Sequence, residues 1–288
     1  FRHHVVERAP DFFTTKSSIL RDGEFLIFGT MKADNGLTFR AQIEVESSTN
    51  GDQIDENWGS VSGSFGEIRI GGDDTVKARM ANGYYIGENF ITGYYNYIPR
   101  ASATAREGLA GNGLDPVGIH YFSPNFQGFQ FGASYIPQTG SDGAGDSNNP
   151  VFNANAPGDN TWAIAGRYDG KFGDFGFGVS AGYIDGDNVG DAFHVGGNVS
   201  YSGFGVAAHY ENDADGNEWT VGTQYKSGPW TVAGGFANEN QPGHNNRGLA
   251  AWATYRLVPG VSLTASVENH DSAAENAVNG FAYMTIRF

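Results

Sequence analysis

Most of the 288-residue chain alternates between apolar side chains and polar or small ones with a period of two. Residues 37–46 read LTFRAQIEVE, which places Leu37, Phe39 and Ile43 on one side of an extended chain and hydrophilic residues on the other. This is the period of a β-strand and not of a helical stripe. The alternation returns at 129–135, 162–168, 175–183, 193–201, 204–210, 219–225, 230–236, 249–255, 261–267 and 282–288. The pattern therefore predicts an all-β protein.

Alternation alone does not say which face of a strand meets water, because a soluble β-sandwich also has one apolar face on each strand. Two features indicate that the apolar faces contact a membrane. Many apolar runs begin and end with aromatic residues, as Trp162 and Tyr168 or Trp219 and Tyr225 do, and rings are expected at the two interfaces of a bilayer. Glycines such as Gly176 occupy the opposite faces, which suits bent strands and an open lumen. No apolar run approaches the roughly 18 residues of a membrane-spanning helix, so any crossing is by strands.

We count about sixteen strands, the first expected at residues 1–8. Tight turns alternate with longer polar connections, which are predicted at 9–22, 47–55, 74–114, 137–160, 184–191, 212–216, 238–247 and 270–278. Short turns on one rim and long loops on the other are typical of an up-and-down antiparallel barrel. A closed sheet of this size is too wide for side chains to fill, so it encloses an aqueous channel. We predict one transmembrane β-barrel domain over residues 1–288.

Charge and residue types exclude several other functions. The formal net charge is -15, from 17 Lys and Arg against 32 Asp and Glu, which disfavours a nucleic-acid partner. Cysteine is absent, so disulfides, thiolate metal sites and a cysteine nucleophile are excluded. The seven histidines lack the spacing of a zinc helix and a nucleophile-elbow serine, so we predict no enzyme. An outer-membrane barrel hydrolase and a soluble extracellular β protein, such as a lectin or a sandwich hydrolase, stay as alternatives.

Two segments resemble Gram-negative general diffusion porins. Residues 56–72, ENWGSVSGSFGEIRIGG, are similar to the strand-turn-strand that precedes the third loop of these porins. Residues 279–288, NGFAYMTIRF, are similar to their last strand with its terminal Phe, and residues 15–46 look like porins of photosynthetic alphaproteobacteria. The resemblance implies a homotrimer in the outer membrane of a Gram-negative bacterium, in contact with lipid and lipopolysaccharide. It also implies passive diffusion of small hydrophilic solutes and ions without a cofactor.

In that family the long third loop folds into the pore, where its acidic residues face basic residues of the wall. The resemblance places this loop at about residues 73–113, which here carry basic as well as acidic side chains. The implied pore constriction consists of Asp73, Asp74, Glu88 and Glu107 on the loop, with Arg2, Arg40 and Arg69 on the first strands and Arg167 further along the wall. The arginines of the first strands are expected to face Asp74 and Glu88. Because the net charge is negative, we expect a mild preference for cations.

A calcium site is one hypothesis for the segment that contains Asp213 and Asp215, since carboxylates at alternate positions can converge on a hard cation. The other ligands of the twelve-residue calcium loop are missing here. Asp and Gly are also common turn formers, so a simple turn is the alternative interpretation.

A sugar-selective porin is the alternative within the channel class. The predicted third loop is rich in rings, with tyrosines at positions 84, 85, 94, 95 and 97. In sugar-specific porins such rings form a sliding track for pyranose faces. The competing explanation is that these rings pack the loop against the barrel wall.

Overall fold

The computed structural model describes residues 2–3, 24–46, 54–83, 85–86, 89–90, 117–137, 160–186, 191–213, 216–242, 244–271 and 276–287. The strands are β1 (Arg2–His3), β2 (Glu24–Lys32), β3 (Thr38–Glu46), β4 (Ile54–Gly63), β5 (Gly66–Gly72), β6 (Tyr85–Ile86), β7 (Asn89–Phe90), β8 (Val117–Phe122), β9 (Phe129–Ile136), β10 (Thr161–Phe172), β11 (Phe175–Asp185), β12 (Ala192–Tyr201), β13 (Phe204–Asp213), β14 (Gly216–Ser227), β15 (Trp230–Gln241), β16 (His244–Val258), β17 (Val261–Asp271) and β18 (Asn276–Ile286). One short helix, α1 (Val76–Arg79), follows β5. Across these described ranges, no helix is both long and apolar enough to cross a membrane.

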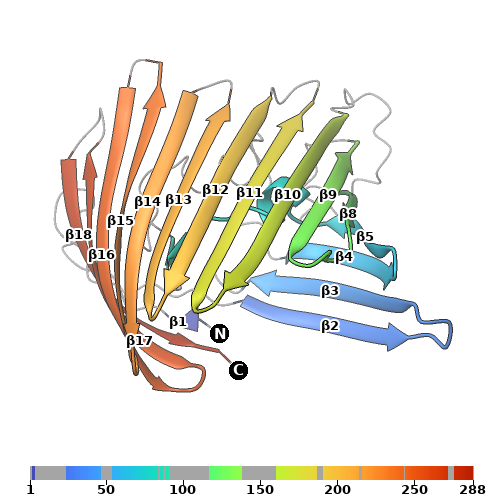
Figure 1. Ribbon diagram of the computed structural model, residues 1–288, viewed down its shortest axis with the longest axis horizontal. Helices are drawn as coiled ribbons and strands as arrows, with labels where there is room; N and C mark the ends of the chain where they lie inside the picture. Colours follow the sequence, from blue (N-terminus) through green and yellow to red (C-terminus); the bar gives the residue numbers. More distant parts are fainter. Residues whose placement is uncertain are drawn as a thin grey trace.

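Sixteen of the described strands form one sheet in which neighbours along the chain lie side by side. The order runs from β2 through β5 to β8, then through each later strand to β18, and β18 pairs with β1. The first and last strands are antiparallel neighbours, with Arg2 opposite Thr285. Figure 1 shows tilted, curving strands joined by short turns at one rim, where both termini also lie. The predicted all-β, antiparallel up-and-down fold of about sixteen strands is confirmed.

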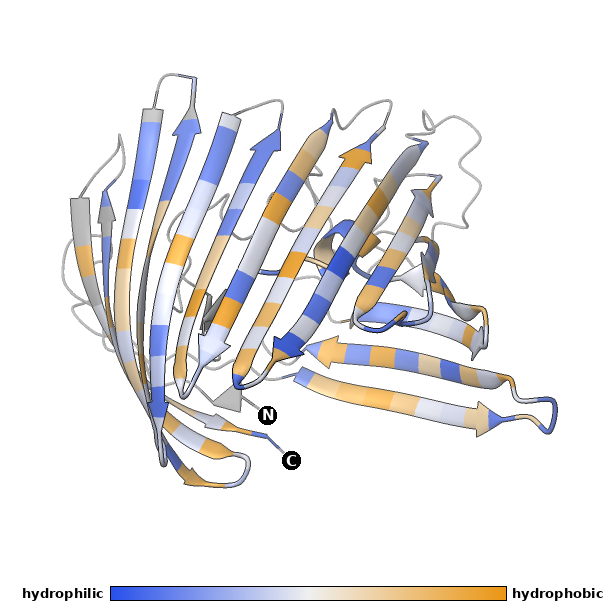
Figure 2. Cartoon of the chain, viewed as in Figure 1, coloured by the Kyte–Doolittle hydropathy of each residue, from blue (hydrophilic) through white to orange (hydrophobic). Residues whose placement is uncertain are grey.

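Each strand has one apolar and one polar face. On β14, Trp219, Val221 and Tyr225 are exposed, whereas Glu218 and Thr220, the neighbours of Trp219 in the chain, are buried. Neighbouring strands expose large apolar side chains on the same side, among them Phe131, Ile164, Val179, Val195, Val206, Val232, Leu249 and Val267. Figure 2 shows this alternation as hydrophobic and hydrophilic bands along the strands. A continuous exposed apolar surface of this extent marks contact with a membrane or a partner. We call the two sides of the sheet the apolar face and the polar face.

Aromatic side chains form two rows on the apolar face. The row near the long connections contains the ring pairs Trp162–Tyr183, Phe193–Tyr210 and Trp219–Phe236, with centroids 5.2 to 6.0 Å apart. The row near the short turns contains Tyr168–Phe177, Phe175–Tyr201, Phe204–Tyr225 and Trp230–Tyr255, at 4.3 to 5.7 Å. Trp219 and Tyr225 belong to different rows and lie about 20 Å apart along β14. Two aromatic rows that flank an aliphatic band are typical of strands that cross a bilayer.

Several long connections are shorter than the sequence predicts. The segment 238–247 was expected to be a loop, but β15 continues to Gln241 and β16 begins at His244. The predicted connections 184–191, 212–216 and 270–278 are shortened in the same way. Beyond the aromatic row both faces are polar, as in the pair Glu239 and Asn246, so the alternation stops while the backbone ladder continues. Of the predicted first strand, only Arg2–His3 falls within the described residues.

Candidate functional site

The chain that follows β5 turns back onto the polar face of the sheet. Residues 73–83, here called the loop segment, begin with buried Asp73 and Asp74 and continue into α1, whose Val76 and Lys77 are fully buried. The helix contacts β8, β9, β10 and β11, and β6 further along the same connection contacts β13, β14 and β15. The connection therefore runs across the polar face of at least seven neighbouring strands.

Side chains of the wall hold the backbone of the loop segment. The amide of Val76 donates to Oγ of Ser134 at 2.9 Å, and the amide of Asn82 donates to Oγ of Ser180 at 2.7 Å. The carbonyl oxygen of Asn82 accepts from Nδ1 of His209 at 3.1 Å. Buried backbone groups outside regular structure need such partners. Polar residues of β9, β11 and β13 therefore fix the path of the segment.

Glycines of the wall make room for the loop segment. A Cβ atom at Gly196 would lie 1.8 Å from the carbonyl oxygen of Asn82, and one at Gly132 would lie 2.8 Å from Cγ1 of Val76. Gly83 has a φ of +95°, and a Cβ there would lie 2.0 Å from the carbonyl oxygen of Ala208 on β13. The sequence suggested strand bending and an open lumen as the reason for such glycines. At these positions the reason is close backbone approach.

A buried lysine of the loop segment faces a row of glutamates. Glu211, Glu218 and Glu239 are directly opposed on β13, β14 and β15, an arrangement that is destabilising for like charges. Nζ of Lys77 lies 2.7 Å from Oε1 of Glu211, and Nε2 of His209 lies 3.7 Å from the other oxygen of the same carboxylate. The loop segment thus supplies a positive charge to the acidic wall.

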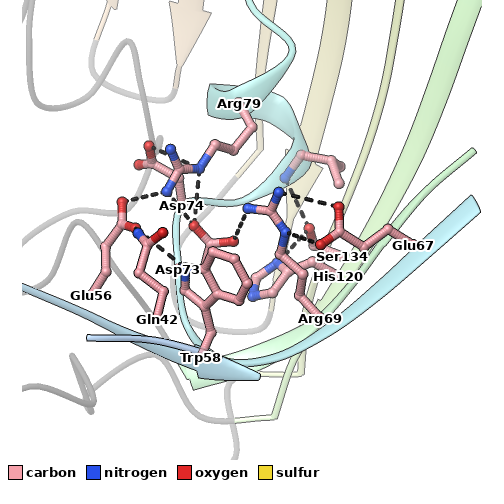
Figure 3. Close-up of polar contacts among 11 residues, drawn as sticks. Gln42, Glu56, Trp58, Glu67, Arg69, Asp73, Asp74, Arg79, His120 and Ser134 are labelled. Atoms are coloured by element: carbon pink, nitrogen blue, oxygen red, sulfur yellow. Dashed lines mark hydrogen bonds and ion pairs between the residues drawn. The ribbon is translucent and has the colours of Figure 1, made fainter. Parts of the chain in front are cut away.

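An arginine and carboxylate cluster lies at the start of the loop segment (Figure 3). Asp73 bridges two guanidinium groups, with 2.8 Å from Oδ2 to NH1 of Arg69 and 2.9 Å from Oδ1 to Nε of Arg79. Arg79 also pairs with Glu56, and its Nε lies 3.6 Å from Oδ2 of Asp74. Arg69 pairs with Glu67 as well, so two cations and four carboxylates are packed together between β4, β5 and α1.

The charge of Arg79 is secured by its neighbours. Burial by itself lowers the pKa of the Arg79 guanidinium, but the carboxylates of Asp73, Asp74 and Glu56 outweigh it and raise the pKa well above the ordinary value. The carboxylate of Glu56 also accepts from Nε2 of Gln42 at 2.9 Å. The cluster thus consists of charged side chains that join the loop segment to β3, β4 and β5.

The wall arginines stack on aromatic rings of the polar face. The guanidinium carbon of Arg69 lies 4.4 Å from the ring centre of Trp58 and 4.8 Å from that of Phe122. Arg40 lies 5.8 Å from Trp58 and 6.0 Å from Phe28. Such cation–π contacts hold a cation at a fixed place on a surface. The two arginines therefore have defined positions beside the loop segment.

The structure brings some of the predicted constriction residues together. Asp73, Asp74 and Arg69 belong to one cluster, in which Arg69 pairs with Asp73 while Asp74 lies near Arg79. Arg40 lies on the same face and remains exposed. Arg69 thus lies beside Asp73 and not beside Asp74, and the role of these residues in a constriction stays a prediction.

Other predicted residues lie elsewhere. NH2 of Arg167 on β10 is 2.7 Å from Oδ2 of its neighbour Asp169, so Arg167 forms a local ion pair and does not join the cluster. The predicted residues Glu88 and Glu107 lie outside the described residues. The same holds for the side chain of Arg2 and for the side chains of the tyrosines at 84, 85, 94, 95 and 97.

Sequence reasoning missed four partners of the site. Lys77 and Arg79 were counted only as basic residues of the third loop, and Glu56 and Glu211 received no role. A signal existed for Glu211, because it follows the polar parity of β13. Glu239, which lies opposite Glu218 in the same row, was hidden, because 238–247 was predicted to be a loop.

Asp213 and Gly216 of the proposed calcium segment are paired at the ends of β13 and β14, which favours the turn interpretation. Oδ1 of Asp213 accepts a hydrogen bond of 2.9 Å from the amide of Gly216, whereas Asp215 lies outside the described residues. In the described residues, no group of three or more His, Asp or Glu side chains could hold a metal ion. The calcium site stays a hypothesis, and the turn accounts for the contact of Asp213.

These features define a class of protein. An antiparallel barrel with an apolar face, two aromatic rows and a charged polar face is a transmembrane β-barrel of the channel type. The model of the Gram-negative porin family matches residues 7–274, and the chain belongs to this family. Its members are channels of the outer membrane, so this protein is an outer-membrane channel and not an enzyme.

Solved structures agree with this assignment at the level of the fold. A double mutant and a triple mutant of the Rhodopseudomonas blastica porin each match with a TM-score of 0.69 and 15% identity, over 99% of this chain and 96% of theirs. A loop-deletion mutant of OmpT from Vibrio cholerae matches with a TM-score of 0.66 and 13% identity, over 94% of this chain and 92% of that one. No curated protein matches the sequence. The expected resemblance to alphaproteobacterial porins is confirmed.

Proposed function

We propose that this outer-membrane channel passes small hydrophilic solutes and ions by passive diffusion and mildly prefers cations. The observation that carries the proposal is the loop segment, which lies across the polar face and makes ion pairs to the wall at two positions, through Asp73 and Arg69 and through Lys77 and Glu211. A wide sheet closed around water needs no cofactor or energy source for such transport.

The proposed constriction is the loop at about 73–113, folded into the lumen. Most of residues 73–83 are buried against the wall, and both signs of charge meet there in the cluster of Arg69, Arg79 and Asp73. Fixed charges of opposite sign on two sides of a narrow passage produce a transverse field that orients dipolar solutes and disfavours apolar ones. Glu88 and Glu107 of the same loop are proposed to continue its acidic side.

Cation preference is supported by the balance of charge. The chain carries a formal net charge of -15, and the polar face includes the row of Glu211, Glu218 and Glu239. A negative potential raises the local concentration of cations. Reversal potentials across a salt gradient in planar bilayers test this point. A permeability ratio that favours cations is expected, and a clear preference for anions would reject it.

Pore size and sugar selectivity are tested together. Single-channel conductance is recorded in a series of neutral sugars of increasing size. Sugars that enter the pore lower its conductance, so the size above which a sugar no longer lowers it reports the pore diameter. A general diffusion channel responds to size alone. Saturable block by one sugar would instead favour the sugar-selective alternative.

The assembly is proposed to be a homotrimer whose remaining apolar surface contacts outer-membrane lipid and lipopolysaccharide. On β2 and β3 the exposed apolar side chains include Phe25, Ile27, Met31, Phe39 and Ile43, a surface that needs either lipid or a partner. Native mass spectrometry from detergent measures the oligomeric state directly, and a monomer at all concentrations would contradict the homotrimer.

Calcium binding is a separate hypothesis for Asp213 and Asp215. Calcium titration by calorimetry tests it.

A further inference from the structure

A cavity of about 450 Å³ lies at the rim of the short turns, away from the loop segment. It is formed between the β14–β15 turn, the β16–β17 turn and the end of β18 (Figure 1). Its lining includes three cations and several hydroxyl groups, namely Lys226, Arg256, Arg287, Thr231, Thr254 and Thr285. Of the described residues that line it, none is acidic. The charged side chains that line the cavity are therefore all hydrogen-bond donors.

Two of these cations have no carboxylate partner nearby. Lys226 and Arg256 are exposed, and the described portion of the chain places no Asp or Glu within ion-pair distance of either. Arg69, Arg79 and Arg167, by contrast, each pair with a carboxylate. In a chain with 17 basic and 32 acidic residues, a cavity whose charged lining residues are all basic stands out. Its charge is available to a ligand.

The cavity lies on the water-facing side of the sheet. Arg256 is opposite Ser262, and Thr254 donates to or accepts from Thr264 at 2.8 Å, so these residues share the polar face with buried Trp252. Lipid contacts the other face. A ligand of this cavity is therefore a dissolved solute and not a membrane lipid.

The acidic wall is too far away to repel an anion from the cavity. Glu218 and Lys226 lie on the same strand, and their separation along β14 is about 26 Å. This exceeds the screening length of about 8 Å at physiological salt. The cations of the cavity are thus separated along the pore axis from the row of Glu211, Glu218 and Glu239.

We propose that this cavity binds solutes that carry two or more phosphate groups. Guanidinium groups form paired hydrogen bonds with phosphate oxygens, an ammonium adds a point charge, and threonine hydroxyls supply further donors. The volume lies in the range of small-molecule sites and exceeds the need of a single inorganic ion. This binding goes beyond the proposed function, because it needs the folded barrel but not conduction.

Calorimetric titration of the detergent-solubilised protein with pyrophosphate tests the proposal. Saturable binding is expected at moderate salt. Lys226→Gln or Arg256→Gln alone should weaken it by about tenfold and the double variant by about a hundredfold, since each removes charge-assisted hydrogen bonds. Lys171→Gln is the matched control, because Lys171 is an exposed lysine near the short-turn end of β10 that does not line the cavity. Absence of saturable binding, or equal binding by all variants, would overturn the proposal.

Further arms exclude trivial outcomes. Resistance of the folded barrel to detergent denaturation shows that each variant is folded. Titrations with inorganic phosphate, chloride and citrate compare pyrophosphate with an anion that has one phosphate group, with a monatomic anion and with a carboxylate anion. Citrate binding as tight as that of pyrophosphate would contradict the phosphate assignment. Pyrophosphate block of current from the short-turn side alone is an additional readout. A protein that binds but does not conduct would refute the channel proposal while leaving the site intact.

Discussion

Nζ of Lys77 lies 2.7 Å from Oε1 of Glu211, a buried ion pair between residues 134 positions apart. The lysine side chain is fully buried and the glutamate side chain is 4% exposed. The pair attaches the loop segment to β13 and neutralises one end of the glutamate row. The position of the loop segment therefore depends on this contact.

Lys77→Met is expected to release the loop segment. Removal of one partner of a buried ion pair costs about 3–5 kcal/mol, because the other charge is left without compensation. Limited proteolysis with mass spectrometry should show faster cleavage near residues 80–83. Lys32→Met, which removes an exposed lysine of β2, is the control and should leave cleavage unchanged. Adding Glu211→Leu to the first variant should restore part of the protection, and equal cleavage of all variants would contradict the role of the pair.

Gly196→Ala is expected to displace the loop segment by contact alone. The new methyl group would overlap the carbonyl oxygen of Asn82, so the segment must move. Single-channel conductance should change and become noisier. Gly29→Ala is the matched control, since a Cβ at Gly29 meets nothing within 4 Å. If both variants conduct like the original protein, the glycine at 196 does not position the segment.

Arg79→Gln is expected to increase the preference for cations. The substitution leaves Asp73, Asp74 and Glu56 without their shared cation, and one charge at about 4 Å in water is worth about 1 kcal/mol, or a factor of about five in the permeability ratio. Reversal potentials measure the ratio. Arg167→Gln, which removes an arginine already paired with Asp169, should have a smaller effect. A larger change in the permeability ratio for Arg167→Gln than for Arg79→Gln would show that the constriction lies near β10.

The contribution of Arg79 should not depend on pH in the alkaline range. Although burial opposes its charge, the surrounding carboxylates raise its pKa, so the group stays protonated and its stabilising contribution is complete below the ordinary arginine pKa. We expect the selectivity difference between the original protein and Arg79→Gln to be the same at pH 7 and pH 10. A difference that disappears on raising the pH would mean that Arg79 is deprotonated.

Glu88→Ala is expected to lower the preference for cations without a large change in fold. Glu88 lies in the loop proposed to narrow the lumen, where loss of one negative charge reduces the attraction for cations. Permeability ratios measure this effect, and circular dichroism checks the fold. An unchanged ratio would place the constriction at other residues of the loop.

The sequence by itself determined the architecture of this protein. Alternation along one strand is local, because successive side chains point to opposite faces, so the apolar face and its aromatic ends at Trp219 and Tyr225 could be predicted from neighbouring letters. The turns and the approximate strand number followed from the same alternation. The family followed from the two segments, residues 56–72 and 279–288, that resemble porins. The strand ends beyond the aromatic rows were missed, because both faces are polar there.

Only the tertiary structure decided which charges meet. Lys77 reaches Glu211 across 134 positions because the loop segment crosses the polar face, and Arg256 and Lys226 share a cavity because β14 and β16, on either side of β15, carry these residues near the same rim. Parity assigns a side chain to a face but says nothing of its height along the barrel axis or of the loop that covers it. Pairing depends on three-dimensional distance, which a periodic pattern does not contain.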